Sequence, residues 1–388
     1  MKGGCLVTFQ FNDILEDLMI NQERLVNAFL EYVQISSPTK KEGEFAKHIT
    51  KILTEIGFEV TVDDAGEKLG CDTGNVIAKM KGNTGSAPIL FSCHMDTVSP
   101  GENIKPIIKD GVIYSDGTTI LGGDDKAGIA AIVEAIKVIK ENQMPHGDLE
   151  IVFSIFEEGG LHGAKNLNYD EIHAKHAFVL DSGGDPGQVI VQGPAQDKLD
   201  FKVIGRPAHA GVAPEEGISA IMVASEAIVN MTLLRIDAET TANIGRIEGG
   251  TVTNIVAPEC VVKAEARSLD NDKLAKQSAH MVECFEKAAE KFGAKVECEV
   301  ARMYSAFNVA TDAAIVKNVF AACEAVGLKP FTASSGGGSD TNVFNANGIM
   351  AVNLGIGERK PHTLEEHLHI VDLVNASKLV LEIIKQYA

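Results

Sequence analysis

Hydrophobic positions in the first half of the chain alternate between helix-like and strand-like spacing. An interval of three or four residues, typical of a helix, separates the apolar positions Phe45, Ile49, Ile52, Leu53 and Ile56. Thr39 is placed to cap this helix and Gly57 to end it. Short, largely apolar segments typical of strands then follow as FEVTVDD, NVIAKM and APILFSCH.

The alternation continues to about residue 181. A second helix is predicted from Asp125 to about Asn142, and the strands LEIVFSIF and HAFVLD come after it. Strands that are continuously apolar and alternate with helices are typical of a mainly parallel sheet flanked by helices. The pattern therefore predicts an α/β fold.

The pattern changes near residue 193. The segments KLDFKVIG, ISAIMVASEAIVNM, TANIGRIEGG, ECVVKAEARS, LAKQSAHMVECFEKAAEKF and KVECEVARM have the order β-α-β-β-α-β. This order is typical of a ferredoxin-like α+β unit. After residue 307 a helix around 312–326, the turn GGGSD, the strand GIMAVNLG and a helix over 371–387 are predicted. We expect a discontinuous domain of residues 1–192 and 307–388, interrupted by an inserted domain of residues 193–306.

Composition narrows the class of protein. The formal net charge of −19 disfavours nucleic acid as a partner. The seven cysteines are odd in number and form no CxxC, so we expect a reducing, cytoplasmic location rather than a disulfide framework. No apolar run approaches the ~20 residues of a membrane span. The start, MKGGCLVTFQFNDILEDLM, lacks the apolar core of a signal peptide. Residues 1 to about 12 are expected to be a loose extension.

Several apolar strands end in residues that can bind a metal or transfer a proton. In open α/β sheets, ligands bind beyond the carboxyl ends of the strands. The candidates at or between those ends are His94, Asp96, Asp124, Asp125, Glu157, Glu158 and Asp181. Crowded carboxylates repel one another unless a cation lies among them. Since the set combines histidine with carboxylates and has no cysteine, it favours Zn²⁺, Mn²⁺ or Co²⁺.

Two pairs within this set suggest a division of roles. His94 and Asp96 are one residue apart, so on an extended segment both side chains point the same way. His94 can then bind a metal through one ring nitrogen while Asp96 accepts the other ring N–H. Glu157 and Glu158 are adjacent and should point to opposite faces of a strand. One is then a metal ligand and the other a general base.

A series of motifs extends the pattern beyond these residues. In chain order they are CHMDTVSPG, LGGDDKAG, FEEGGLHGAKNL, LDSGG, GRPAHAGVAPEEGISAI, EGGTVTNIVAPE, GGGSD and HTLEE. In content and order they resemble the dinuclear-zinc peptidases related to aminoacylase, carboxypeptidase G and peptidase T. LGGDDKAGIAAI is most similar to the peptidase T branch. The resemblance covers about residues 45 to 387.

The resemblance implies a catalytic domain that binds two zinc ions, with Mn²⁺ or Co²⁺ as substitutes. His94 and Asp181 would hold one ion, Glu158 and His362 the other, and Asp124 would bridge them. The inserted domain would serve as a lid and as the contact of a homodimer.

Further roles also follow from the resemblance. Glu157 would be the general base that takes a proton from the bridging, metal-bound water and passes it to the leaving amine. Asp96 would orient its neighbouring ligand, and the peptide bond between Asp124 and Asp125 would be cis. His209 would reach the active site of the partner subunit and stabilise the oxyanion. Residues implied to contact substrate are Asn254, Arg267, Gly337, Gly338, Ser339 and Asp340.

The reaction implied is metal-dependent hydrolysis of short peptides, by a dizinc aminopeptidase of the tripeptidase type. The alternative is a carboxypeptidase or an N-acyl amino acid deacylase with the same amide chemistry, since Arg267 could grip a substrate carboxylate in either case. A protein that binds metal or peptide without hydrolysing it is a third hypothesis. It would need a lost ligand or base, and all these positions are filled.

Other interpretations of single residues stay open on the sequence alone. Each carboxylate could be an ordinary turn or helix-start residue. His367 and His369 are spaced like His94 and Asp96 and could replace His362 as a ligand, although His362 fits the family pattern His-x-x-x-Glu. Cys93 could suggest a thiol nucleophile, but its place within a strand favours a role in the core.

Overall fold

The computed structural model describes residues 20–388, which divide into two compact units. Unit 1 contains the described residues up to Val191 together with Val309–Ala333 and Ser339–Ala388. Unit 2 contains Gln192–Asn308 and Ser334–Gly338. The expected loose extension at residues 1 to about 12 and the expected lack of a signal peptide concern a segment outside the described residues.

Unit 1 is built on a mixed sheet with the strand order β1-β2-β6-β3-β7-β16-β8. These strands are β1 (Glu59–Val62), β2 (Val76–Met80), β3 (Ile89–His94), β6 (Leu149–Ser154), β7 (His176–Ser182), β8 (Gln188–Gly193) and β16 (Met350–Gly355). The α/β fold class is confirmed. The central strands β6, β3, β7 and β16 run parallel, whereas β1, β2 and β8 pair antiparallel. A continuous apolar run indicates that a strand is buried on both faces. It does not indicate whether the strand runs parallel or antiparallel to its neighbours.

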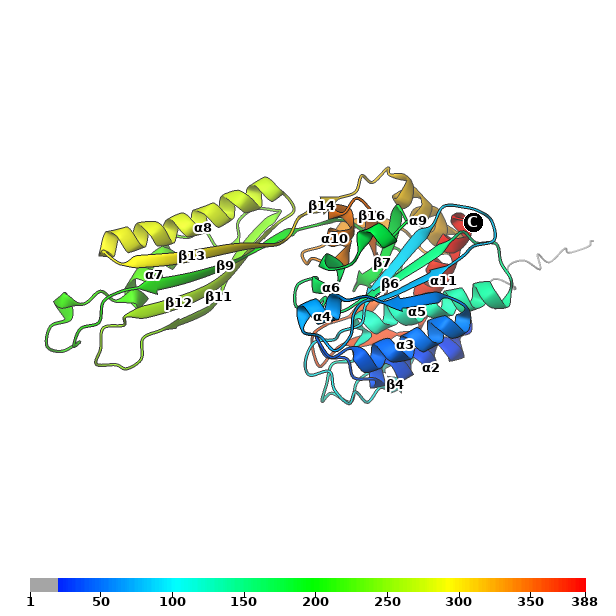
Figure 1. Cartoon of the computed structure of the whole chain (residues 1–388), viewed down its shortest axis with the longest axis horizontal. Helices are drawn as coiled ribbons and strands as arrows, with labels where there is room; N and C mark the ends of the chain where they lie inside the picture. The colour runs from blue at the N-terminus through cyan, green and yellow to red at the C-terminus, as the bar shows by residue number, and fades with distance from the viewer. Residues whose placement is uncertain (1–19) are drawn as a thin grey trace, which may run out of the picture. The chain divides into compact units, whose positions relative to one another are not determined.

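Helices cover both faces of this sheet (Figure 1). They are α2 (Gln22–Gln34), α3 (Gly43–Ile56), α4 (Ala65–Leu69), α5 (Gly123–Glu141), α6 (His162–Lys165), α9 (Ala314–Ala325), α10 (Asp340–Ala346) and α11 (Ile370–Gln386). Helix α5 packs against β3, α2 and α11. On the other face, Phe344 of α10 lies in one cluster with Leu90 and Val152. The central strands are therefore buried on both faces, and a site can form only at the edge of the sheet where their carboxyl ends lie.

Helix α3 begins later than the sequence suggested. Its first residue is Gly43, whose N–H donates to Asp72 (2.9 Å), so the prediction that Thr39 caps it is wrong. The Thr39 hydroxyl instead donates to Asp96 (2.8 Å). Helices α2 and α10 were not predicted. Helix α10 follows a capping box in which Ser339 and Asn342 satisfy each other's backbone N–H groups.

A second, smaller sheet in unit 1 has the order β17-β18-β5-β4. Its strands are β4 (Ile107–Lys109), β5 (Val112–Tyr114), β17 (Glu358–Arg359) and β18 (His367–His369). It connects the segment before α5 with the segment before α11. Across residues 20–388, none of the helices combines the length and apolar character that a membrane span requires.

Unit 2 is an antiparallel sheet of order β10-β11-β12-β9-β13 covered by two helices (Figure 1). Its elements are β9 (Ala195–Ile204), α7 (Ala220–Val229), β10 (Leu234–Arg235), β11 (Thr240–Gly249), β12 (Glu259–Ser268), α8 (Asn271–Phe292) and β13 (Lys295–Tyr304). Leaving out the short β10, the order is the predicted β-α-β-β-α-β. The core centres on Phe201 and Phe285, whose rings stack at 4.0 Å.

Candidate metal centre

The carboxyl ends of three central strands meet at one edge of the sheet in unit 1. Strand β3 is parallel to both β6 and β7, so the three strands end on the same side. His94 is the last residue of β3, and Asp181 lies near the end of β7. Glu157 and Glu158 follow the end of β6 at Ser154. The sheet thus delivers imidazole and carboxylate groups to one place.

Asp124 lies between two histidines at this edge. Its Oδ1 is 2.9 Å from Nε2 of His94, and its Oδ2 is 3.1 Å from Nε2 of His362. His94 Nε2 is also 3.8 Å from Asp181, and His362 Nε2 is 2.9 Å from Glu158. One oxygen of a single carboxylate therefore faces each histidine, as sharing between two cations requires. The expected ligand residues are all within this cluster.

The electrostatics of the cluster suit cations. Burial, with the charge of Asp124 added to it, raises the pKa of Asp181 well above its ordinary value. Burial also raises the pKa of Glu157, against the opposing charge of His94. Glu158 Oε1 is buried, and its contact is with Nε2 of His362 at 2.9 Å. A positive charge placed among buried carboxylates reduces their mutual repulsion and stabilises their ionised form. Ligand atoms of His94, Asp124 and Glu158, and those of His94, Asp125 and Asp181, lie within 4.8 Å of one another.

The histidines carry the compensating charge in the protein itself. Burial opposes protonation of His94, but hydrogen bonds to Asp124 and Asp96 raise its pKa well above the ordinary value. The contacts with Asp124 and Glu158 raise the pKa of His362 to about 10. The imidazoles of His94 and His362 thus lie against the same carboxylates that two divalent ions would neutralise. Nitrogen and oxygen donors without thiolate suit Zn²⁺, Mn²⁺ or Co²⁺.

Asp96 holds the backbone of the turn that follows β6. Its carboxylate accepts hydrogen bonds from the N–H groups of Glu157 (2.9 Å) and Glu158 (3.3 Å). The closest partner of His94 Nδ1 is the main-chain oxygen of Asp96 at 2.8 Å, while a carboxylate oxygen is 3.5 Å away. Asp96 thus fixes the orientation of His94 mainly through its main-chain oxygen. Its carboxylate binds the backbone of the turn that carries Glu157 and Glu158.

Glu157 and Glu158 are separated by a turn and not by strand alternation. Strand β6 ends at Ser154, so the argument from opposite strand faces does not apply. The main-chain oxygen of Glu157 accepts the N–H groups of Gly160 (2.8 Å) and Leu161 (2.7 Å). The Glu157 side chain is buried and takes part in no hydrogen bond among those found for the described residues. It is the one carboxylate of the pair without a histidine contact.

His367 and His369 lie outside the cluster. Both belong to β18, and the ring of His367 stacks on Tyr114 at 5.3 Å. Cys93 is buried and its thiol faces Leu180 O at 3.8 Å. Burial raises the pKa of this thiol, which argues against a thiolate nucleophile. The peptide bond between Asp124 and Asp125 is cis, as the resemblance implied.

The residues expected to contact substrate are divided between the units. Unit 2 holds His209, Asn254, Arg267, Gly337 and Gly338, whereas unit 1 holds Ser339 and Asp340. His209 is exposed in the loop before α7, and its backbone pairs with Ile255. Arg267 forms a two-pronged ion pair with Glu265 (both 3.1 Å), and Gln196 donates to the same carboxylate. Asp340 is buried and bonded to Ser154.

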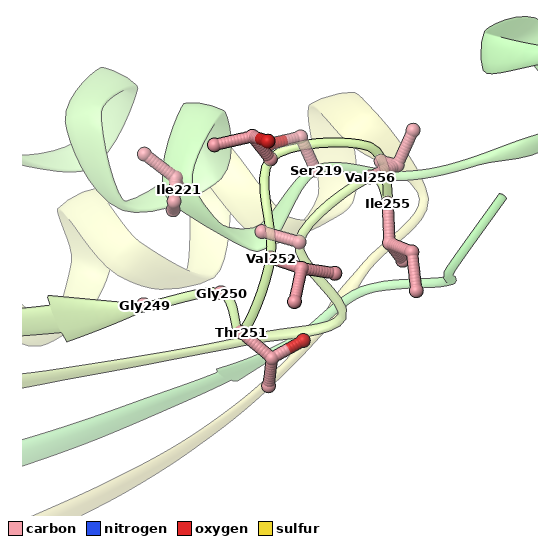
Figure 2. Close-up of a pocket in the computed structure, with 10 residues that line it drawn as sticks. Ser219, Ile221, Gly249, Gly250, Thr251, Val252, Ile255 and Val256 are labelled. Atoms are coloured by element: carbon pink, nitrogen blue, oxygen red, sulfur yellow. The ribbon is translucent and has the colours of Figure 1, made fainter. Parts of the chain in front are cut away.

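A hollow of about 490 Å³ lies in unit 2 beside the loop that carries Asn254 (Figure 2). Its lining residues are Ser219, Ile221, Gly249, Gly250, Thr251, Val252, Thr253, Ile255, Val256 and Ala257. None of these side chains ionises, so the hollow has no group for metal binding or proton transfer.

Comparison with known proteins decides the family. The sequence pattern of peptidase family M20/M25/M40 matches residues 90–386. The chain belongs to this family. It is 48% identical to aminopeptidase PepT from Bacillus cereus ATCC 10987, whose structure matches with a TM-score of 0.89 over 95% of this chain and 99% of that one. A tripeptidase from Staphylococcus aureus subsp. aureus Mu50 is 43% identical, with a TM-score of 0.92 over 95% and 98%. The protein YqjE of Bacillus subtilis (strain 168) is 45% identical over 95% of this chain and 100% of its own.

The likeness to PepT and to the tripeptidase, together with membership in the M20 family, confirms the expected peptidase T-like resemblance. The chain is a metallopeptidase, a hydrolase, and this disfavours the hypothesis of a non-catalytic binder. The central mixed sheet with an inserted domain also agrees with the structures of these M20 relatives.

The sequence pointed to Asp125 and Glu366 without revealing their contacts at this M20 site, and it missed Asn353 and Glu358. Asp125 accepts the N–H of His94 (3.2 Å), and Asn353 exchanges two hydrogen bonds with the backbone of Asp181 (2.8 and 2.9 Å). Glu358 is buried, and burial together with Asp124 raises its pKa well above the ordinary value. Glu366 accepts backbone N–H groups at the start of α5. The sequence offered one signal for these residues, namely a polar residue within or beside an apolar segment. That signal does not indicate which group each polar side chain contacts.

Proposed function

We propose that this M20 metallopeptidase hydrolyses short peptides with two divalent ions, most naturally zinc. His94 and Asp181 would hold one ion, Glu158 and His362 the second, and Asp124 would serve both. The observation that carries the proposal is that the two oxygens of Asp124 face His94 (2.9 Å) and His362 (3.1 Å). A carboxylate placed between two histidines is suited to bridging, and the other ligands lie one on each side of it.

The protein's own residues would manage the proton. Bound divalent ions would polarise the scissile carbonyl and lower the pKa of the attacking water. Glu157 would accept the proton from that water and deliver it to the leaving amine, because it is the buried carboxylate of the turn without a histidine contact. Burial raises the pKa of Glu157, which makes it a stronger base than an exposed glutamate.

The substrate we propose is a short peptide attacked at its amino-terminal bond, with tripeptides as the first class to test. Support comes from the aminopeptidase PepT and the tripeptidase, which are 48% and 43% identical to this chain. We assign substrate contacts to Asn254, Arg267 and the Gly337–Asp340 segment. Arg267 is held by Glu265 on two of its nitrogens, which leaves Nη1 directed at the main chain of Gly336 (3.5 Å).

A side-by-side screen tests the substrate class. The metal-free protein is reloaded with zinc, manganese or cobalt and assayed on tripeptides, dipeptides and N-acyl amino acids. The proposal expects release of the amino-terminal residue from tripeptides at the highest kcat/KM. Release of the carboxyl-terminal residue, or preference for N-acyl amino acids, would instead establish the carboxypeptidase or deacylase alternative.

We also propose that unit 2 pairs with a second copy of itself, and that His209 acts in the active site of the partner subunit. Support comes from strongly exposed apolar side chains in unit 2, which are Val212, Met222, Val229, Leu234 and Val252. Strand β13 lies at one edge of its sheet, the position at which a strand of a second copy could add to it. His209 is exposed, as a residue acting across an interface would be before assembly.

A further inference from the structure

Glu366 is a buried carboxylate that holds the start of helix α5 by its backbone. Its side chain is 1% exposed. Oε2 accepts the N–H groups of Leu121 (2.7 Å) and Gly122 (2.9 Å). Oε1 accepts those of Gly123 (2.6 Å) and Asp124 (3.3 Å). These N–H groups precede regular helical geometry, so the helix itself offers them no acceptor.

The same glutamate anchors the loop that carries His362. This loop runs between β17 and β18, and the His362 side chain is 49% exposed. His362 has a φ of +61°, a left-handed conformation that a residue other than glycine adopts only when its surroundings impose it. The N–H of Glu366 donates to Thr363 O (3.1 Å), which closes the turn directly after His362. Glu366 therefore links the exposed loop of His362 to the buried start of α5 through its own hydrogen bonds.

Glu366 thus joins two proposed ligands that are far apart in sequence. Asp124 is one of the residues whose N–H it accepts, and His362 precedes it by one tight turn. The fit is close, because a Cβ at Gly123 would lie 3.0 Å from Oε1 of Glu366 and 3.6 Å from Cγ of Glu358. Movement of the Glu366 carboxylate would shift the Asp124 backbone and the His362 loop relative to each other.

We propose that Glu366 is a positioning residue that sets the distance between Asp124 and His362, and with it the affinity for the ion that these two share with Glu158. This inference rests on the proposed two-metal function and deepens it. Groups that orient metal ligands typically change metal affinity by about 10- to 100-fold when they are altered. Glu366 also closes the turn after His362, which would hold only one of the ions, so its loss should weaken that ion more than the other.

The experiment compares Glu366→Gln with Glu365→Gln. The neighbouring Glu365 is exposed and pairs with Lys360, so its variant controls for removing one carboxylate from the same loop. Zinc affinity of the metal-free proteins is measured by competition with a chromophoric chelator, and cobalt-loaded samples are compared by visible absorption. Neither readout needs a peptide substrate. In Glu366→Gln the amide N–H₂ would face backbone N–H groups that require an acceptor.

We expect Glu366→Gln to bind one of two zinc ions at least about 10-fold more weakly and to alter the cobalt spectrum of that ion. Glu365→Gln should match the unaltered protein in both respects. Excess zinc should restore hydrolysis of Leu-Gly-Gly by Glu366→Gln, since the defect lies in metal binding. Equal zinc affinities in folded Glu366→Gln and the unaltered protein would overturn the inference while the proposed function stands. An unaltered protein that binds no zinc would overturn both.

A second variant decides the matter if Glu366→Gln does not fold. Gly123→Ala adds a methyl group against Oε1 of Glu366, and the backbone of Gly123 is not left-handed. It should weaken the same ion in the same direction by a smaller factor. Wild-type zinc affinity and an unchanged cobalt spectrum in folded Gly123→Ala would then overturn the inference.

Discussion

The carboxylate of Asp96 accepts a 2.9 Å hydrogen bond from the backbone N–H of Glu157. Asp96 is fully buried and also receives the hydroxyl of Thr39 at 2.8 Å. The residue that orients His94 from one strand thereby fixes the turn that carries the proposed base from the next strand. Ligand and base are positioned by a single side chain and its own backbone.

Asp96→Asn should lower kcat by about 10- to 100-fold and leave KM little changed, because an amide cannot accept all three hydrogen bonds. Steady-state kinetics at saturating zinc checks this. Asp72→Asn is the matched control, since Asp72 makes the same kind of contact to the N–H of Gly43. Equal losses of kcat in both variants would point to general destabilisation and contradict the role of Asp96.

Glu157→Gln should keep bound zinc and reduce turnover by at least about 10²-fold, the usual effect of losing a general base. Metal content and kcat are measured on the same preparation. Glu67→Gln, an exposed site on α4, serves as the control for a lost carboxylate. Near-normal turnover by Glu157→Gln would refute the assignment of the base.

The fold class and most of the candidate ligand residues follow from local pattern. Alternating apolar runs predict the α/β class. Polar residues at or after the ends of β3, β6 and β7 predict the cluster, because parallel strands deliver their carboxyl ends to one edge. His362 could be found only through the resemblance, since it lies on an exposed loop and no apolar strand ends directly before it.

Contacts between side chains and distant backbone could not be predicted in this way. Thr39 looks like a helix cap, yet its hydroxyl binds Asp96, which is 57 residues away. Glu366 reaches the N–H of Gly123 across 243 residues. Nothing in the local spacing of either segment encodes such pairs, because they arise only when the strands and loops are assembled.

Lys126 should make stability depend on pH. Its ammonium is fully buried, donates to Ile35 O (2.7 Å), and burial lowers its pKa from 10.5 to about 7. Above pH 7 the folded state releases a proton that the unfolded chain retains, so stability should rise by about 2 kcal/mol between pH 7 and 9. Urea unfolding of the metal-free protein at both pH values measures this. Lys126→Met should remove this rise in stability. Lys140→Met, on the exposed side of α5, is the control and should keep it. An equal rise in both variants and the unaltered protein would contradict the account.

If His209 acts in the partner's active site, a His209 variant and a Glu157 variant should restore activity to each other when their subunits are mixed. His209→Ala and Glu157→Gln should each be nearly inactive alone. If His209 acts across a dimer, mixing them should restore about a quarter of wild-type activity, because half of the dimers are mixed and each then has one complete site. Activity of the mixture after exchange of subunits, followed with sedimentation equilibrium, measures this. A mixture no more active than its parts, or a monomeric protein, would contradict action in the partner's site.

The most direct test of the central claim is a zinc titration of the metal-free protein. Bound zinc and hydrolysis of Leu-Gly-Gly are measured in the same samples. The account predicts that binding saturates at two zinc ions per chain, that hydrolysis appears as they bind, and that a chelator abolishes it reversibly. A folded, fully zinc-loaded protein that hydrolyses no peptide or acyl amino acid, or hydrolysis that survives complete removal of the metal, would contradict it.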